Sequence, residues 1–211
     1  MKKIIFLLAA SVFCFQIAGL SQTRVGITGG VSVSNMSGSE SGGSSRAGFM
    51  GGIMLERSIG KSNFSFRPSI SYVQKGQTLT HPMGTLIDKL WLGLRYAEFN
   101  PDFLYYLNNG SKANFYIGAG PSIAFNLPSK RVSETNGVKT IKTIKFGKDG
   151  GNDMRGTDWG ANFTAGFRAS NGFLFNLNYN RGFRNLVTEG STGDLKNSYF
   201  GIQLGWYLNN K

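Results

Sequence analysis

Histidine and cysteine, two side chains that often catalyse reactions or bind metal ions, are scarce in this chain. Its 211 residues include one histidine, His81, and one cysteine, Cys14. His81 lies beside Pro82 with Asp88 nearby, and a histidine, a hydroxyl group and an acid can together form a hydrolase or acyltransferase site. Catalytic groups work best on rigid elements, however, and residues 75–89 around His81 are expected to form a loop. We therefore predict that the protein is not an enzyme.

The sequence also lacks the patterns that bind metal ions or cofactors. One histidine and one cysteine leave carboxylates as the main ligands, and no calcium-binding D-x-[DN]-x-[DN]-G loop is present. The Gly-Gly pairs at 29–30, 42–43 and 150–151 are not followed by a helical pattern, which a phosphate-binding loop requires. No cofactor and no metal site is predicted.

A set of polar residues is placed to interact with one another instead. These residues alternate with apolar ones, so in β-strands the two kinds would lie on opposite faces. If the polar face lines a narrow interior, unpaired charges there would be costly. We predict that the set forms a salt-bridged network whose role is mainly structural. Its predicted members are Glu56, Arg67, Arg95, Glu98, Arg168 and Gln203.

Basic residues are concentrated in one segment, residues 127–157. Seven lysines and arginines lie there against three acids, Glu134, Asp149 and Asp153. Such a surface suits anionic lipid headgroups or acidic glycans, and an ordinary solvated loop is an equally good interpretation. Nucleic acid is not expected as a partner, because the chain begins like an exported protein. The seven bases are Lys130, Arg131, Lys139, Lys142, Lys145, Lys148 and Arg155.

The composition favours β-structure as the framework for these residues. The chain has 30 Gly, 17 Phe, 8 Tyr and 3 Trp, and 16% of its residues are charged, compared with about 25% in a typical soluble domain. Disordered chains are poor in aromatic residues and rich in charge. Long helices do not tolerate many glycines, and a disulfide scaffold needs more than one cysteine. An all-β fold remains.

Residues 1–21 are predicted to be a cleaved signal peptide. Lys2 and Lys3 precede an apolar run from Ile4 to Phe15, and small residues follow up to Ser21. The run is shorter than the about 20 apolar residues that a membrane-spanning helix needs. Residues 22–211 would then form a single mature domain.

Alternation of apolar and polar residues predicts eight β-strands. The gaps between them are long and short in turn, as expected when loops lie at one end of an up-and-down sheet and tight turns at the other. In one segment the apolar phase slips, which predicts a β-bulge near residues 96–98. The eight segments are 25–33, 46–57, 64–72, 90–107, 115–126, 159–167, 173–180 and 199–208.

The two faces of these strands favour a membrane barrel. Segments 115–126, 159–167, 173–180 and 198–208 contain no charged residue, whereas the wet face of a soluble barrel should carry Lys and Glu. Only helices and closed barrels satisfy their backbone groups within lipid. We predict an eight-stranded antiparallel up-and-down transmembrane β-barrel in the cell outer membrane. A soluble lipocalin-like carrier is the alternative.

Segment 127–157 is the largest departure from a minimal barrel, and we expect it to form a long extracellular loop. Residues 138–146 mix β-branched residues with lysines, which predicts that they supply two strands of a hairpin beyond the membrane. The glycine-rich residues 147–153 would then form the turn and the return.

Four short motifs lie along the mature chain: VGITGG at 25–30, YAEFNP with FLYY at 96–106, YIGAGP at 116–121 and NYNRGF at 178–183. In sequence and order they resemble the motifs of the PorT-like outer-membrane β-barrel family. The resemblance implies an eight-stranded barrel in a Gram-negative outer membrane and no settled biochemical activity. Some members of that family are linked to type IX secretion and gliding.

Together these observations predict a non-enzymatic integral outer-membrane barrel with a structural or interaction role. One alternative is an accessory component of type IX secretion or gliding machinery. A further alternative is a lipid A-modifying barrel enzyme that uses His81. The expected partners are outer-membrane lipid and lipopolysaccharide, the barrel assembly machinery during biogenesis, and envelope or secretion proteins.

Overall fold

The computed structural model describes residues 23–39, 42–82, 86–107, 113–190 and 193–209. Within these residues it contains nine β-strands, and no helix there is long and apolar enough to cross a membrane. The predicted signal peptide, residues 1–21, lies outside the described residues. The strands are β1 (Thr23–Ser37), β2 (Ser44–Ser58), β3 (Phe64–Thr80), β4 (Lys89–Tyr106), β5 (Ala113–Thr135), β6 (Val138–Thr143), β7 (Thr157–Ala169), β8 (Phe173–Gly182) and β9 (Lys196–Tyr207).

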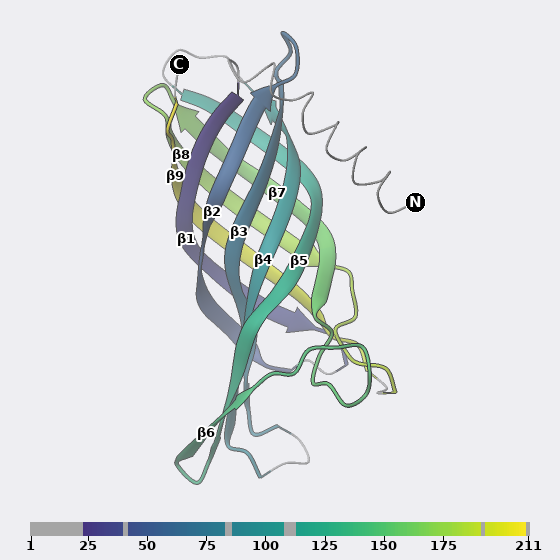
Figure 1. Cartoon of the computed structure of the whole chain (residues 1–211). Coiled ribbons are helices and arrows are strands. Elements are labelled where there is room, and N and C mark those ends of the chain that lie inside the picture. The colour runs from purple at the N-terminus through teal and green to yellow at the C-terminus, as the bar shows by residue number, and fades with distance from the viewer. Residues whose placement is uncertain (1–22, 40–41, 83–85, 108–112, 191–192, 210–211) are drawn as a thin grey trace.

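Eight of these strands close into an antiparallel barrel (Figure 1). Strands β1 to β5 pair in sequence, β5 also pairs with β7, and β8 and β9 follow in order. The ring closes where β9 pairs with β1, in a register that runs from Gly26 opposite Tyr207 to Ser37 opposite Lys196. Because the ring is closed, its wall has no free strand edge. The predicted eight-stranded up-and-down barrel is confirmed.

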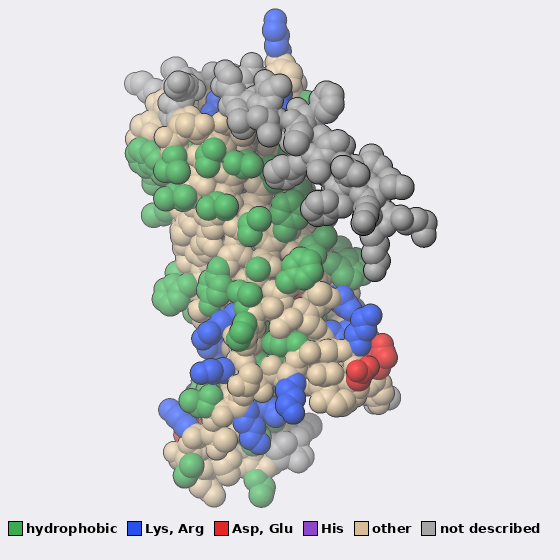
Figure 2. All heavy atoms as spheres, in the orientation of Figure 1, with side chains coloured by type: hydrophobic (Ala, Val, Ile, Leu, Met, Phe, Trp, Pro, Cys, Tyr) green, Lys and Arg blue, Asp and Glu red, His purple; other side chains and the backbone are tan. Residues whose placement is uncertain are grey.

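The alternation seen in the sequence separates the two faces of the wall. Along β9, Ile202 and Leu204 are exposed on the outside, whereas Gln203 between them is buried inside. Outward side chains of the other strands are likewise apolar, and we call them the belt. Figure 2 shows such side chains on the visible face of the barrel wall. The belt includes Val31, Phe49, Ile53, Ile70, Phe99, Phe103, Ile117, Ile123, Phe163 and Tyr179. This outer surface is suited to lipid.

The two ends of the barrel differ in construction (Figure 1). At one end, which we call the turn end, short turns at 59–63 and 170–172 lie beside the start of β1 and the end of β9. The backbone N–H of Leu208 donates to the carbonyl of Val25 there, at 2.8 Å. At the opposite end, β3, β4 and β5 continue past the ring and pair with one another and with β6. We call this four-stranded sheet, made of residues 74–80, 89–95, 127–135 and 138–143, the extension.

The hairpin of the extension differs in position from the predicted one. Residues 138–146 do not supply both strands, because β5 itself continues to Thr135 and pairs with β6. The turn is Asn136-Gly137, with φ values of 50° and 77°. An Asn-Gly pair is favoured in two-residue hairpin turns because both positions require positive φ. The glycine-rich residues 147–153 instead form part of the segment that leads back to the barrel.

The bulge also lies elsewhere than predicted. From Leu94 to Tyr106, every even-numbered residue of β4 is buried, so this strand keeps one phase through residues 96–98. The register shifts between Gly93 and Arg95, which pair with Lys130 and Leu127. Three steps along β5 therefore match two steps along β4, and the extra residue belongs to β5.

Candidate functional site

Near the turn end, the buried carboxylate of Glu56 on β2 is surrounded by side chains from four other strands, β1, β4, β7 and β9. Its Oε1 accepts hydrogen bonds from Arg168 Nη1 at 2.8 Å and from the hydroxyl of Tyr106 at 2.7 Å. The hydroxyl of Tyr207 donates to Oε2, and Arg24 lies 3.7 Å from Oε1. A carboxylate removed from water needs such donors to offset the loss of hydration.

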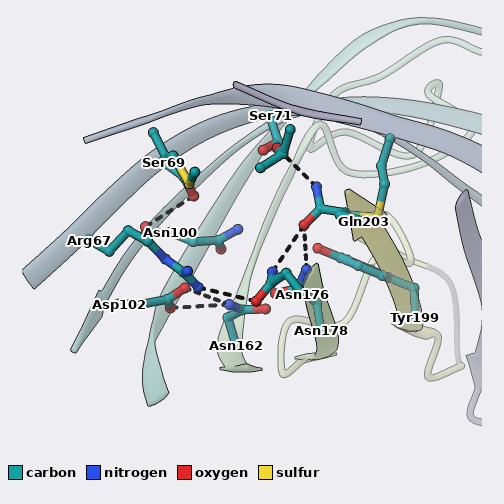
Figure 3. A pocket seen from close by; sticks show the side chains of 13 residues that line it. Arg67, Ser69, Ser71, Asn100, Asp102, Asn162, Asn176, Asn178, Tyr199 and Gln203 are labelled. Carbon is teal, nitrogen blue, oxygen red and sulfur yellow. Dashed lines mark hydrogen bonds between the residues drawn. The ribbon is translucent and has the colours of Figure 1, made fainter. Parts of the chain in front are cut away.

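The middle layer centres on Arg67 of β3 (Figure 3). Arg67 Nη2 donates to Thr164 Oγ1 at 3.2 Å and to Asn176 Oδ1 at 3.3 Å, and the guanidinium lies 4.7 Å from the ring centre of Tyr116. On the other side of the network, the amide groups of Asn176 and Asn178 donate to Gln203 Oε1. Asp102 accepts two hydrogen bonds from the amide of Asn162, at 2.9 and 3.1 Å.

The layer nearest the extension is built on an ion pair between Lys75 and Glu98. Lys75 Nζ lies 2.7 Å from Glu98 Oε2, and both side chains are almost fully buried. Glu98 Oε1 also accepts from the hydroxyl of Tyr199 at 2.6 Å and from the amide of Asn100 at 3.0 Å. The ammonium group of Lys75 lies about 5 Å from the rings of Tyr96 and Tyr199.

One apolar cluster lies at the extension end of this polar column, and another is interleaved with the Glu56 contacts near the turn end. At the turn end the cluster comprises Met54, Leu104, Tyr106, Tyr116, Leu174 and Tyr207. At the extension end it comprises Met36, Leu94, Tyr96, Ala124, Ile144, Met154, Leu186 and Leu195. Between them, the cavity lined by Arg67, Asp102 and Asn176 has a volume of about 20 Å³, which holds about one water molecule. At this level the described side chains therefore fill most of the interior.

The structure brings together five of the six residues predicted for the interior network. Glu56, Arg67, Glu98 and Gln203 are buried, and Arg168 reaches Glu56. Arg95 is wrongly predicted: its side chain is exposed, because β4 keeps its phase and odd-numbered residues face outward. The prediction missed Lys75, Asp102, Asp158 and the inward tyrosines Tyr96, Tyr106, Tyr116, Tyr199 and Tyr207.

Comparison with known families is consistent with this architecture. A model described as the outer membrane protein beta-barrel domain matches residues 16–188. The chain belongs to this family. Membership places the protein in the cell outer membrane, where the apolar belt faces lipid. No curated protein matches the chain in sequence.

Several solved structures are similar to this outer-membrane barrel. Ail, the attachment invasion locus protein of Yersinia pestis, is 12% identical and has a TM-score of 0.44, with 88% of this chain and 98% of that chain covered. Neisserial surface protein A is 11% identical and has a TM-score of 0.45, with 87% of this chain and 97% of that chain covered. OprG of Pseudomonas aeruginosa is 11% identical and has a TM-score of 0.49, with 87% of this chain and 95% of that chain covered. These identities do not carry function from those proteins to this barrel.

The seven bases of segment 127–157 do not form one surface in this barrel. Lys130, Lys139, Lys142, Lys145 and Lys148 are exposed, and Lys139 lies 3.8 Å from Glu134. Arg131 and Arg155 are partly buried, and Arg131 forms an ion pair with Asp153 at 3.2 Å. The segment is also anchored, because Ile144 and Met154 belong to the apolar cluster at the extension end.

His81 lies at the far end of the extension, away from the interior network. Its residue is exposed, and its backbone N–H donates to the carbonyl of Asp88 at 2.8 Å. Within the described residues, the imidazole makes no hydrogen bond to a hydroxyl group or an acid. The same part of the chain contains no group of three His, Cys, Asp or Glu residues that could hold a metal ion.

Proposed function

We propose that this outer-membrane barrel is a non-enzymatic, non-conducting anchor that presents its extension as an interaction surface outside the cell. The observation that carries the proposal is the closed interior. Within it Glu56 is paired with Arg168 and Glu98 with Lys75, and apolar clusters fill the interior near both ends. The extension, in contrast, projects from the ring (Figure 1). Loops and sheets that project from a rigid scaffold are where binding residues concentrate.

The difference between the two ends of the barrel supports an extracellular extension. Small outer-membrane barrels have short periplasmic turns and long extracellular loops. In this barrel the turns at 59–63 and 170–172 lie at one end, and the extension with segments 144–156 and 183–195 lies at the other. The same rule places the start of β1 and the end of β9 in the periplasm.

Cysteine labelling tests this orientation, because the chain has no cysteine besides Cys14. We expect Thr140→Cys, at an exposed position of β6, to react with a membrane-impermeant maleimide on intact cells. Lys61→Cys, at an exposed position of the turn end, should react only after the outer membrane is permeabilised. The reverse pattern would place the extension in the periplasm and overturn the proposal.

Conductance measurements test the closed interior. We expect the purified barrel to produce no ion-conducting steps in planar lipid bilayers, because ions cannot pass a cavity that holds about one water molecule. A porin reconstituted in the same way provides the positive control. Regular single-channel steps from the folded, heat-modifiable barrel would show a conducting state and would contradict the proposal.

A more specific role follows from the motifs that resemble PorT-like barrels. We infer that such a barrel acts as an accessory component of type IX secretion or gliding, with envelope or secretion proteins as partners. The order of the four motifs along β1, β4, β5 and β8 supports this second candidate. Deleting the gene should then abolish secretion of type IX substrates. Normal secretion in the deletion strain would contradict the accessory role in secretion and would leave only the anchor role.

A further inference from the structure

The outward faces of β3, β4 and β5 form a continuous ladder from the apolar belt into the extension. Residues paired across antiparallel strands lie on the same face of the sheet. Ile70, Phe99 and Ile123 form one outward rung of the belt, and Tyr72, Ala97 and Phe125 form the next. Beyond them the rungs are Gln74–Arg95–Leu127, Gly76–Gly93–Lys130, Thr78–Trp91–Val132 and Thr80–Lys89–Glu134. The apolar character of the ladder therefore gives way to basic character.

Three bases lie on this face just beyond the belt, on the side of the extension. Arg95 and Lys130 are exposed, and their rungs lie two and four residues along β4 from the rung of Ala97, about 7 and 13 Å at 3.3 Å per residue. The side chain of Arg46 on β2 lies beside Gly76 and Gly93 of the same ladder. The register between β2 and β3 shifts at this point, between Ser45 and Met50. We call Arg46, Arg95 and Lys130 the collar.

Two glycines make room for the arginine of the collar. A Cβ atom at Gly93 would lie 3.2 Å from Arg46 Nη2, and one at Gly76 would lie 3.4 Å from Arg46 Cδ. The guanidinium therefore lies over Gly93, and a Cβ atom there would also be 3.4 Å from the carbonyl oxygen of Lys130. Within the described residues, none of the three collar bases forms an ion pair. Figure 2 shows Lys and Arg side chains gathered below the apolar belt.

A second basic group continues the same face outward. The ammonium groups of Lys89 and Lys139 lie 5.1 and 5.4 Å from the ring of Trp91, and both lysines belong to the rung of Glu134, next beyond the rung of Trp91. Glu134 beside Lys139 is the one acid in these outward rungs. The outward face is therefore basic and aromatic at the level where a membrane-inserted barrel meets lipid headgroups.

We propose that the outward face of the extension binds lipopolysaccharide, with the collar contacting the phosphate groups of lipid A. This inference rests on the proposed orientation, because lipopolysaccharide lies in the outer leaflet. Two features support it. The collar is positively charged, as phosphate binding requires, and it lies next to the belt, at the level where lipid acyl chains end and the phosphorylated headgroup begins. Arginine suits phosphate because its guanidinium forms charge-assisted, often bidentate hydrogen bonds. Trp91, Lys89 and Lys139 lie further out, level with phosphorylated core sugars.

Binding of purified lipid A to the detergent-folded full chain tests the proposal. The triple variant Arg46→Gln, Arg95→Gln and Lys130→Gln should bind diphosphorylated lipid A on the order of 100-fold more weakly, from about fivefold for each base near a charged lipid surface. The matched control Lys61→Gln, Lys145→Gln and Lys148→Gln changes the same charge at exposed positions elsewhere. It should bind within about twofold of the parent, and the parent should bind dephosphorylated lipid A far more weakly.

Three results would overturn the proposal: equal losses in both triple variants, equal binding of the two lipid A forms, or competition by millimolar inorganic phosphate. The last would indicate a site for free anions. A heat-modifiability gel checks that each variant is folded, and Arg95→Gln alone, with an expected loss of about fivefold, replaces the triple variant if that variant does not fold. Maleimide labelling of Thr140→Cys separates the two proposals, because an extracellular extension without lipid A binding overturns only this inference.

Discussion

Replacing Lys75 with methionine is expected to lower the free energy of unfolding by about 3–5 kcal/mol, the usual effect of removing one partner from a buried ion pair. Lys75 Nζ lies 2.7 Å from Glu98 Oε2, and their side chains are 1% and 0% exposed. Methionine is unbranched and only one heavy atom shorter than lysine, so it keeps most of the packing against Tyr96 and Tyr199. The loss therefore comes from leaving the Glu98 carboxylate without its cation in a closed interior. Urea titration of the barrel folded in lipid vesicles measures it.

A double variant identifies the cause of that loss. In Lys75→Met with Glu98→Gln the charge is gone from both partners, and the hydroxyl of Tyr199 can still donate to the amide oxygen at position 98. We expect the double variant to be more stable than Lys75→Met alone. Glu134→Gln, which removes the partly exposed pair with Lys139, should cost less than about 1 kcal/mol. If Lys75→Met alone were as stable as the parent, Lys75 would not compensate the buried charge of Glu98.

Most of the wall could be predicted from the sequence because a lipid-facing strand alternates strictly. In β9, for example, Phe200, Ile202 and Leu204 are separated by Gly201 and Gln203, and no other element places apolar residues at a period of two. The same alternation indicated that Glu56 and Glu98 face inward. Asp102 could have been found by continuing the phase of Glu98 along β4.

The errors arose where strands leave the membrane. Beyond the ring, the sheet is no longer apolar on one face, so alternation weakens and strand ends are hidden. Lys75 was assigned to a loop, although it continues the inward phase of Arg67 along β3. The anchoring of Ile144 and Met154 against Leu186 is a contact between distant segments, and no local pattern indicates it. The Asn136-Gly137 turn had a clear local signal that the glycine-rich residues further along obscured.

Replacing Ile202 with arginine is expected to destabilise the folded barrel by about 2–4 kcal/mol, the cost of a charge on the lipid face near the bilayer midplane. Ile202 lies midway along β9, opposite Val31 of β1 and Leu177 of β8. Its side chain is 42% exposed, and in the folded barrel that exposed part contacts acyl chains. Urea titration in vesicles of stated thickness measures the difference from the parent.

The same substitution in the extension provides the matched control. Ile141 on β6 is 63% exposed, more than Ile202, yet it pairs with Val132 beyond the ring, where water replaces lipid. Ile141→Arg should therefore change the free energy of unfolding by less than about 0.5 kcal/mol, as is usual for surface substitutions. Because the two variants introduce the same side chain on the same face of one continuous sheet, their difference reports only the surrounding medium. Equal costs at positions 141 and 202 would mean that the belt and the extension share one environment, which a membrane-spanning barrel does not allow.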